Sequence, residues 1–211
     1  MLTHVEEAYI LENAYIPEHI VSLMTILSKG EPFLAGEYIY FIKDNLAIII
    51  GYPLKGAFSL NHFERFVKSL MKSISCEYFR MAAPQLPDVY LKGSIDRSSD
   101  EYFILPLETL SVKGSLRREV EKALEILTVE RVHTTDESHS MLIDEMLERV
   151  KPGERIEKLY LGMPDYVEKS DTAVILNAKD SEGRLVAFYI LELAAKRFIT
   201  YLLGCYSRKH Y

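Results

Sequence analysis

The stretch that decides the fold runs from Asp171 to Tyr206 and reads DTAVILNAKDSEGRLVAFYILELAAKRFITYLLGCY. Its apolar runs and turn residues predict three consecutive β-strands, Thr172–Ala178, Arg184–Leu193 and Arg197–Tyr206. Asp180–Gly183 supplies the aspartate, serine and glycine of a tight reversal, because these residues tolerate left-handed backbone and bond it locally. Ala194–Lys196 joins the second strand to the third.

These strands are apolar on nearly every residue, as in Leu185–Leu191 and Phe198–Leu203. A half-exposed sheet alternates apolar and polar residues instead, so the pattern predicts a central sheet that helices cover on both faces. The chain ends at Tyr211, and no helix follows the last strand to supply such cover. What covers the second face therefore bears directly on the function.

Upstream of this stretch, the sequence predicts two successive groups of helices and strands. In the first group, the expected helices are Pro17–Ser28 and Leu60–Ile74, and the expected strands are Gly36–Lys43, Leu46–Gly51, Cys76–Ala82 and Tyr102–Leu107. In the second group, the expected elements are the helix Leu116–Leu127, the strand Thr128–His133 and the helices Asp136–Val150 and Arg155–Leu161. The apolar stripe expected to face the interior consists of Leu116, Val120, Leu124 and Leu127. We predict an α/β (α+β) fold of mixed, largely antiparallel sheets flanked by helices, in two halves, residues 1–112 and 113–211.

The composition is that of an ordinary globular protein, with 211 residues of which 48% are hydrophobic and 11% aromatic. The formal charge of −6 argues against a general nucleic-acid binder, and so against DNA as a partner, because phosphate neutralisation needs a surplus of Lys and Arg. Cys76 and Cys205 are far apart, which gives neither a disulfide framework nor a zinc spacing. The N-terminus lacks a signal-peptide pattern, and no apolar run approaches the ~18 residues that span a bilayer. These features predict a cytoplasmic protein without a transmembrane segment.

Three passages resemble the GNAT (N-acetyltransferase) superfamily. The resemblance is closer to the tandem GNAT-like proteins, which include the C-terminal domain of phosphatidylglycerol lysyltransferases and the Fem-type aminoacyltransferases. The passages are the hairpin Asp44–Pro53, the basic linker helix Leu110–Val120 and the turn and strand Glu182–Tyr189. Gly-Arg-Leu-Val-Ala-Phe, at the centre of the third passage, is the most specific of these matches.

The resemblance implies acyl or aminoacyl transfer from an acyl-CoA or an aminoacyl-tRNA to an amine or hydroxyl. In that fold the donor's pantetheine arm bonds the backbone of the fourth strand, which here corresponds to Arg197–Tyr206. A Gly-rich loop and a helix N-terminus then hold the pyrophosphate, because their unsatisfied N–H groups attract anions. This sequence departs from the family at that point, since only Ser207–Tyr211 follows.

The departure leaves three explanations open. The chain is truncated after the fourth strand relative to the working protein, or it is a degenerate member, or another chain completes its sheet. We expect no tightly bound cofactor. We also expect this chain alone to bind CoA poorly, so that an acyl-CoA would act only as a co-substrate.

The candidate catalytic residues are Glu192, which interrupts an apolar strand, and Tyr206 at the end of the next strand. Glu192 suits a general base that faces a cleft, and a carboxylate at the sheet edge or in solvent is the alternative. Tyr206 suits a general acid, and packing is the alternative. The resemblance implies donor-binding residues at Leu203, Gly204, Cys205, Ser207, Arg208 and Lys209. Cys205 is otherwise a small core residue, and the basic tail from Ser207 is otherwise a solvated terminus.

Two further clusters have simpler explanations. The loop with Gly51, Pro53, Lys55 and Gly56 lies between a strand and a helix, as a phosphate-binding loop does, but it lacks the P-loop spacing and is explained by a turn. The group His133, Asp136, Glu137 and His139 lacks metal-ligand spacing, so no metal is predicted.

Three functions remain open from the sequence. The first is a GNAT-type acyltransferase or aminoacyltransferase, whose acceptor is a small molecule or a peptide or lipid amine. The second is a non-catalytic interaction module, which pairs with a partner or with a second copy through an open sheet edge. The third is a small-molecule binding protein that uses a crevice between the two halves.

Overall fold

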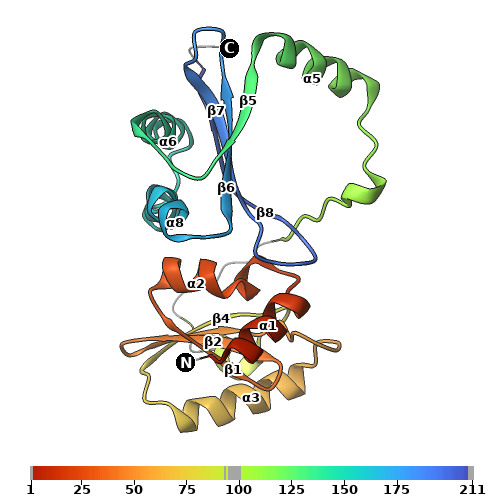
Figure 1. The fold of residues 1–211 in the computed structure, drawn as a ribbon. Helices are drawn as coiled ribbons and strands as arrows, with labels where there is room; N and C mark the ends of the chain where they lie inside the picture. Colours follow the sequence, from red (N-terminus) through yellow and green to blue (C-terminus); the bar gives the residue numbers. More distant parts are fainter. Residues whose placement is uncertain (1, 93, 95–100, 209–211) are drawn as a thin grey trace. The chain divides into compact units, whose positions relative to one another are not determined.

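The computed structural model describes residues 2–92, 94 and 101–208 (Figure 1). Its contacts divide the chain into two compact units. Unit 1 comprises Met1–Glu101 with Ala195–Phe198, and unit 2 comprises Tyr102–Ala194 with Ile199–Tyr211. Each unit contains one four-stranded sheet with helices beside it. The predicted α+β fold in two halves is therefore confirmed, whereas the boundary predicted at 112/113 stays a prediction.

Unit 1 is built on the strand order β1-β2-β3-β4. The strands are β1 (Glu31–Ala35), β2 (Tyr38–Lys43), β3 (Leu46–Ile50) and β4 (Tyr78–Ala82). The first three run antiparallel, and β4 lies parallel to β3 because helix α3 (Leu60–Ser73) returns the chain to the same edge. Asp44, with φ of 53°, sits in the two-residue turn between β2 and β3. The predicted hairpin, helix and following strand are thus present.

Both faces of this sheet are covered. Helices α1 (His4–Asn13) and α2 (Val21–Ser28) lie on one face and α3 on the other (Figure 1). The core beside α1 and α2 consists of Ile10, Ile16, Ile39, Phe41, Ile50 and Leu54. The core beside α3 consists of Tyr38, Ile49, Phe63, Val67 and Leu70. Neighbouring residues of one strand, such as Tyr38 and Ile39, are therefore both buried although they point to opposite faces.

Unit 2 is built on a fully antiparallel sheet with the order β5-β6-β7-β8. The strands are β5 (Thr128–Val132), β6 (Ala173–Lys179), β7 (Leu185–Glu192) and β8 (Thr200–Tyr206). The helices are α5 (Gly114–Ile126), α6 (Glu137–Val150), α7 (Glu154–Leu161) and α8 (Met163–Lys169). The turn before β7 has Gly183 at φ of 78°, and the Asp180 carboxylate accepts hydrogen bonds from the backbone N–H groups of Glu182 and Arg184.

In the part of unit 2 that the structure describes, helices cover only one face of this second sheet. Helices α6 and α8 lie on the same side of the strands (Figure 1). On that face of β7, Phe188 is fully buried and its ring centroid lies 5.0 Å from that of His139 of α6. On the other face, Tyr189 is 50% exposed and Tyr201 is 58% exposed. The prediction that helices cover both faces is therefore wrong for this sheet, because apolar runs do not reveal whether a second layer exists.

Several local predictions are also corrected. Residues Tyr102–Leu107 form no strand, since this segment is irregular and leads into a 3₁₀ turn at Leu107–Thr109. The stripe of α5 does not face the interior, because Leu116, Val120 and Leu124 are each about half exposed or more. The third strand of the opening stretch begins only at Thr200, after a longer connection than predicted. Elements absent from the predictions are α1, β1 and the short helix α4 (Asp88–Leu91).

Among the described residues, no helix combines the length and the apolar character needed to cross a bilayer.

Candidate functional site

The two residues predicted to act in catalysis lie at opposite ends of the β7–β8 ladder. Glu192 pairs with Thr200 at one end, and Tyr206 pairs with Ala187 at the other. Five residue steps along β7 separate the two positions, which corresponds to about 17 Å at the rise of an antiparallel strand. Glu192 and Tyr206 therefore do not contact the same substrate atom.

Glu192 is enclosed in a buried hydrogen-bond cluster at the end of β7. Its side chain has no solvent exposure. One carboxylate oxygen, Oε2, accepts hydrogen bonds from the hydroxyl groups of Tyr166 and, at 3.2 Å, Ser170. The other oxygen, Oε1, accepts one from the backbone N–H of Ala194 at 2.7 Å. These bonds tie the end of α8 to the sheet and leave the carboxylate out of contact with solvent.

The tyrosine in this cluster is held in its neutral form. Tyr166 is fully buried, and burial together with the hydrogen bond to Glu192 raises the pKa of its hydroxyl. A buried donor that faces a carboxylate stabilises the charged acceptor, which is otherwise costly to remove from water. Thr200 Oγ1 lies nearby in the ladder and is buried without a hydrogen-bond partner in the part of the chain that the structure describes. The hydrogen bonds of this cluster therefore serve to hold the C-terminal end of β7 in position.

The predicted donor-binding residues lie along β8, which is the outer strand of the sheet. Within the described ranges, no strand pairs with its outer edge. Leu203 and Cys205 point into the core, while Gly204 lies on the opposite, open face. Burial raises the pKa of the Cys205 thiol to about 12, although the charge of Arg149 acts in the opposite direction. A buried, protonated thiol is a poor nucleophile. The part of β8 that a ligand can reach is therefore its backbone and not the side chain of Cys205.

A cluster of charged side chains surrounds the end of β8. The backbone N–H of Ser207 donates to the carbonyl oxygen of Val186 at 2.8 Å and so extends the ladder by one bond. The backbone N–H of Arg208 donates to Glu145 Oε1 at 2.8 Å, which joins the chain to α6. Lys209, the last predicted donor-binding residue, lies outside the described residues.

Arg149 of α6 brings a second cation to this end. Its guanidinium carbon lies 4.3 Å from the centroid of the Tyr206 ring, a cation–π contact. Its Nη1 is buried and has no hydrogen-bond partner among the described residues. A hollow of about 330 Å³ opens here, lined by Glu145, Glu148, Arg149 and Arg208. We call this group the β8-end cluster.

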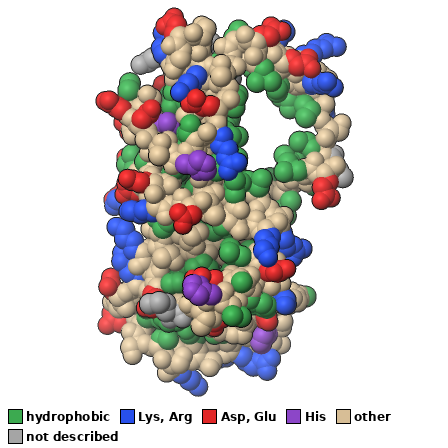
Figure 2. Space-filling model, in the orientation of Figure 1, with side chains coloured by type: hydrophobic (Ala, Val, Ile, Leu, Met, Phe, Trp, Pro, Cys, Tyr) green, Lys and Arg blue, Asp and Glu red, His purple; other side chains and the backbone are tan. Residues whose placement is uncertain are grey.

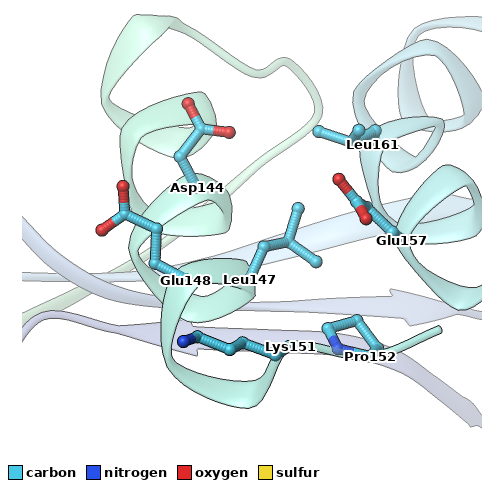
Figure 3. A pocket seen from close by; sticks show the side chains of 7 residues that line it. All are labelled: Asp144, Leu147, Glu148, Lys151, Pro152, Glu157 and Leu161. Atoms are coloured by element: carbon cyan, nitrogen blue, oxygen red, sulfur yellow. The ribbon is translucent and has the colours of Figure 1, made fainter. Parts of the chain in front are cut away.

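A second hollow, of about 420 Å³, lies between α6 and α7 (Figure 3). Its lining residues are Asp144, Leu147, Glu148, Lys151, Pro152, Glu157 and Leu161. Figure 3 shows Leu147 on the side of α6 that is turned toward α7. The three carboxylates disfavour an anionic ligand, and the polar groups do not converge on one point as they do in a typical ligand site.

The loop after β3 is explained by packing within unit 1. A Cβ atom on Gly51 would lie 2.6 Å from both Ala83 Cβ and Phe63 Cζ, so a side chain has no room there. Lys55 is engaged, because its Nζ lies 4.6 Å from the centroid of the Tyr9 ring. Gly56 has φ of 79°, which favours glycine.

The cluster around His139 caps α6. The Asp136 carboxylate accepts a hydrogen bond from the backbone N–H of Ser138 at 2.9 Å and contacts His139 Nδ1 at 2.7 Å. His139 Nε2 lies 3.0 Å from Asn177 Oδ1 of β6, and His133 Nδ1 lies 3.2 Å from the carbonyl oxygen of Ala173. Among the described residues, no group of three or more His, Cys, Asp or Glu side chains could hold a metal ion.

Comparison with known proteins identifies the fold. Neither a protein-family model nor a curated protein sequence matches the chain. Two solved structures match 98% of it and 69% of their own chains, each with a TM-score of 0.52. One is the L-PGS from Bacillus licheniformis, at 16% identity, and the other is the C-terminal domain of a putative lysylphosphatidylglycerol synthetase from Agrobacterium fabrum, at 15%.

The chain has the fold of these two structures. The predicted resemblance to the C-terminal domain of phosphatidylglycerol lysyltransferases is therefore confirmed at the level of the fold.

Sequence reasoning missed the residues that complete both clusters. Arg149 and Glu145 belong to the predicted helix Asp136–Val150, and only the path of β8 past that helix brings them to Tyr206 and Arg208. Tyr166 belongs to the short helix α8, where it is buried together with Met163 and Val167 and resembles a core aromatic residue. The signal that was available is Glu192 itself, because a carboxylate inside an apolar strand requires a buried donor.

Proposed function

We propose that this chain is a GNAT-type aminoacyltransferase domain that uses the open edge of β8 and the β8-end cluster to bind a phosphate-bearing donor. The shared fold with the two synthetase structures supports the reaction class. The observation that carries the proposal is the position of Arg149 and Arg208 at the end of β8, with whose outer edge no described strand pairs. An extended ligand would bond the backbone along this edge and reach the two guanidinium groups at its end.

Arg149 is the stronger of the two anion ligands. Its buried Nη1 carries a hydrogen-bond donor that no described residue satisfies, and a phosphate oxygen would satisfy it. Glu145 and Glu148 line the same hollow, so the site attracts an anion less than two isolated arginines would. This balance suits a donor that must be released after each transfer.

Aminoacyl-tRNA is the donor that we propose, and a hydroxyl or amine is the acceptor. The acceptor oxygen or nitrogen attacks the ester carbonyl of the aminoacyl group. The bond from that carbonyl carbon to the ribose oxygen breaks, and the acceptor's proton passes to the ribose oxygen. Tyr206 is the predicted acid at this end of the ladder, while Glu192 holds the far end of β7 against α8.

A non-catalytic module is the second candidate function. It is favoured by the complete enclosure of Glu192, which removes one predicted base from the surface, and by the distance between Glu192 and Tyr206. In this case the GNAT-like fold serves as a binding scaffold without chemistry.

Ligand-induced stabilisation tests the proposal. The full chain is melted with aminoacyl-tRNA, uncharged tRNA, acetyl-CoA or free CoA, and transfer of a radiolabelled amino acid to hydroxyl and amine acceptors is followed in parallel. A native-state ligand at a hundredfold excess over its Kd stabilises by about 2.7 kcal/mol. We expect aminoacyl-tRNA to stabilise the protein and Arg149→Ala or Arg208→Glu to abolish the effect.

The matched control is Lys158→Ala, which removes an exposed cation of α7 outside the β8-end cluster. If acetyl-CoA stabilises the protein and aminoacyl-tRNA does not, the donor is an acyl-CoA and not an aminoacyl-tRNA. Absence of stabilisation and of transfer with every donor would reject the transferase and favour the non-catalytic module.

A further inference from the structure

Unit 2 carries an extended apolar surface on α5 and on the segment before it. The exposed hydrophobic side chains of this surface are Phe103, Ile104, Leu105, Leu107, Leu110, Val112, Leu116, Val120, Leu124 and Ile126. Figure 2 shows hydrophobic side chains along one side of α5 and charged ones along the other. Exposed apolar side chains gathered in this way mark an interaction surface.

Helix α5 has little to stabilise it by itself. All 13 of its residues are described, and none is buried. It lacks a side-chain N-cap and an acidic residue in its first turn. Arg117 and Arg118 near its N-terminus oppose the helix dipole. Because isolated helices shorter than ~12–15 residues are marginal in water, α5 needs a packing partner.

The apolar residues of α5 have the spacing of a helix–helix seam. Leu116, Val120 and Ala123 follow one another at steps of four and three residues, and Leu127, four residues further on, is the residue at which the helix ends. This is the repeat with which two α-helices interdigitate. Ala123 near the centre allows the two backbones to approach closely.

The charges on α5 favour an antiparallel partner of the same sequence. Lys113 and Arg117 make its N-terminal end basic, and Glu121 and Glu125 make its C-terminal half acidic, while Arg117 also pairs with Glu121 within the helix at 3.0 Å. Antiparallel pairing of two copies places each basic end beside an acidic half, whereas parallel pairing places like charges together. The opposed helix dipoles favour the same arrangement.

We propose that two copies of this chain associate through antiparallel packing of their α5 helices, centred between Val120 and Ala123. Leu116, Val120 and Leu124 of α5 are each about half exposed or more, and the pairing would remove them from water. The interface is isologous, because the same stripe serves on both copies. The carboxylates interspersed with the arginines make a lipid surface the poorer partner.

Sedimentation velocity and light scattering of the full chain over about 1–100 µM test the association. We expect a concentration-dependent dimer whose Kd rises at least about tenfold in Val120→Glu, a change at the centre of the seam. The control is Arg118→Gln, on the charged side of the same helix, for which we expect a dimer. Since α5 buries no residue, both variants should melt like the wild type, which separates loss of the dimer from loss of the fold.

Cysteine pairing tests the orientation. In a background with Cys76→Ser and Cys205→Ala, a mixture of Val120→Cys and Ala123→Cys chains should form a mixed disulfide more readily than either variant alone.

Three results would overturn the proposal. The first is a monomer throughout the concentration range, and the second is a dimer that persists in Val120→Glu. The third is disulfide formation that is equally efficient in each single variant, because this would indicate a parallel pair. A monomer that binds anionic vesicles through α5 would assign the stripe to a lipid surface instead.

Discussion

The sheet of unit 1 is buried on both faces, whereas the sheet of unit 2 is buried on only one. In β2 of unit 1, the neighbours Tyr38 and Ile39 point to opposite faces and are 1% and 0% exposed. In β7 of unit 2, the neighbours Phe188 and Tyr189 are 0% and 50% exposed. Both strands are nearly continuous apolar runs. The difference therefore lies in what packs against each sheet and not in the strands themselves.

This contrast indicates that the open face of unit 2 is made for contact. Aromatic and aliphatic side chains that face water lower the solubility of a protein and do not add to the stability of its fold. Within the described residues, unit 2 also contains the exposed apolar stripe of α5 and the edge of β8 with which no strand pairs. Unit 1 thus buries both faces of its sheet, and unit 2 holds the surfaces on which the proposed binding depends.

Alanine substitutions at the two pairs of neighbours should show the largest effect. We expect Tyr38→Ala, Ile39→Ala and Phe188→Ala each to cost about 2–5 kcal/mol, because each leaves a cavity in a packed core. Tyr189→Ala should cost less than about 1 kcal/mol, since half of its surface is already in water. Hydrogen exchange measured in increasing urea reports the stability of each unit separately.

Tyr189→Ala serves as the control in the same strand as Phe188→Ala. A cost at Tyr189 equal to that at Phe188 would contradict the contrast, because it would mean that the second face is covered in solution.

Local pattern was enough to predict most of the elements. The turn Asp180–Gly183 and the apolar strands around it define a hairpin by themselves, and the two apolar runs on either side of Asp44–Asn45 do the same in unit 1. The strand Glu31–Ala35 was missed because it begins with a charge and contains a proline, which suits only an edge strand. The segment Tyr102–Leu107 has strand-like composition but no strand beside it to pair with.

The candidate site was less predictable because it depends on long-range contacts. Glu192 stood out in the sequence as a carboxylate in an apolar strand, but its donor Tyr166 is 26 residues away. Arg149 and Tyr206 are likewise distant in sequence and meet only through the packing of α6 beside β8. Residue patterns identify groups that need a partner, but they do not say which helix supplies it.

The stability of unit 1 should depend on pH through His19. This side chain is fully buried, its Nε2 lies 2.9 Å from the carbonyl oxygen of Tyr52, and burial lowers the pKa of its imidazole to about 4. The unfolded chain binds the proton near pH 6.5, so the unfolded state gains protons first as the pH falls. Unit 1 should therefore lose about 3 kcal/mol between pH 6.5 and pH 4, and this contribution is complete above pH 6.5.

The measurement is urea denaturation of the wild type and of His19→Gln at several pH values. The substitution should flatten the pH dependence of unit 1 and leave that of unit 2 unchanged. His62→Gln, at an exposed histidine of the same unit, is the control and should retain the wild-type slope. Equal slopes in wild type and His19→Gln would show that the imidazole is not held neutral.

The smallest expected changes in stability come from two glycine substitutions, one in each unit. An alanine methyl at Gly51 meets Ala83 Cβ and Phe63 Cζ at 2.6 Å within the packed core of unit 1, and we expect Gly51→Ala to cost about 1–3 kcal/mol. A methyl at Gly204 meets the rings of Tyr189 and Tyr201 on the open face, and these half-exposed rings can rotate away into solvent. Gly204→Ala should therefore cost less than about 1 kcal/mol. Hydrogen exchange resolves the two units here as well, and a penalty at Gly204 as large as that at Gly51 would mean that a partner or a second layer holds the two tyrosines in place.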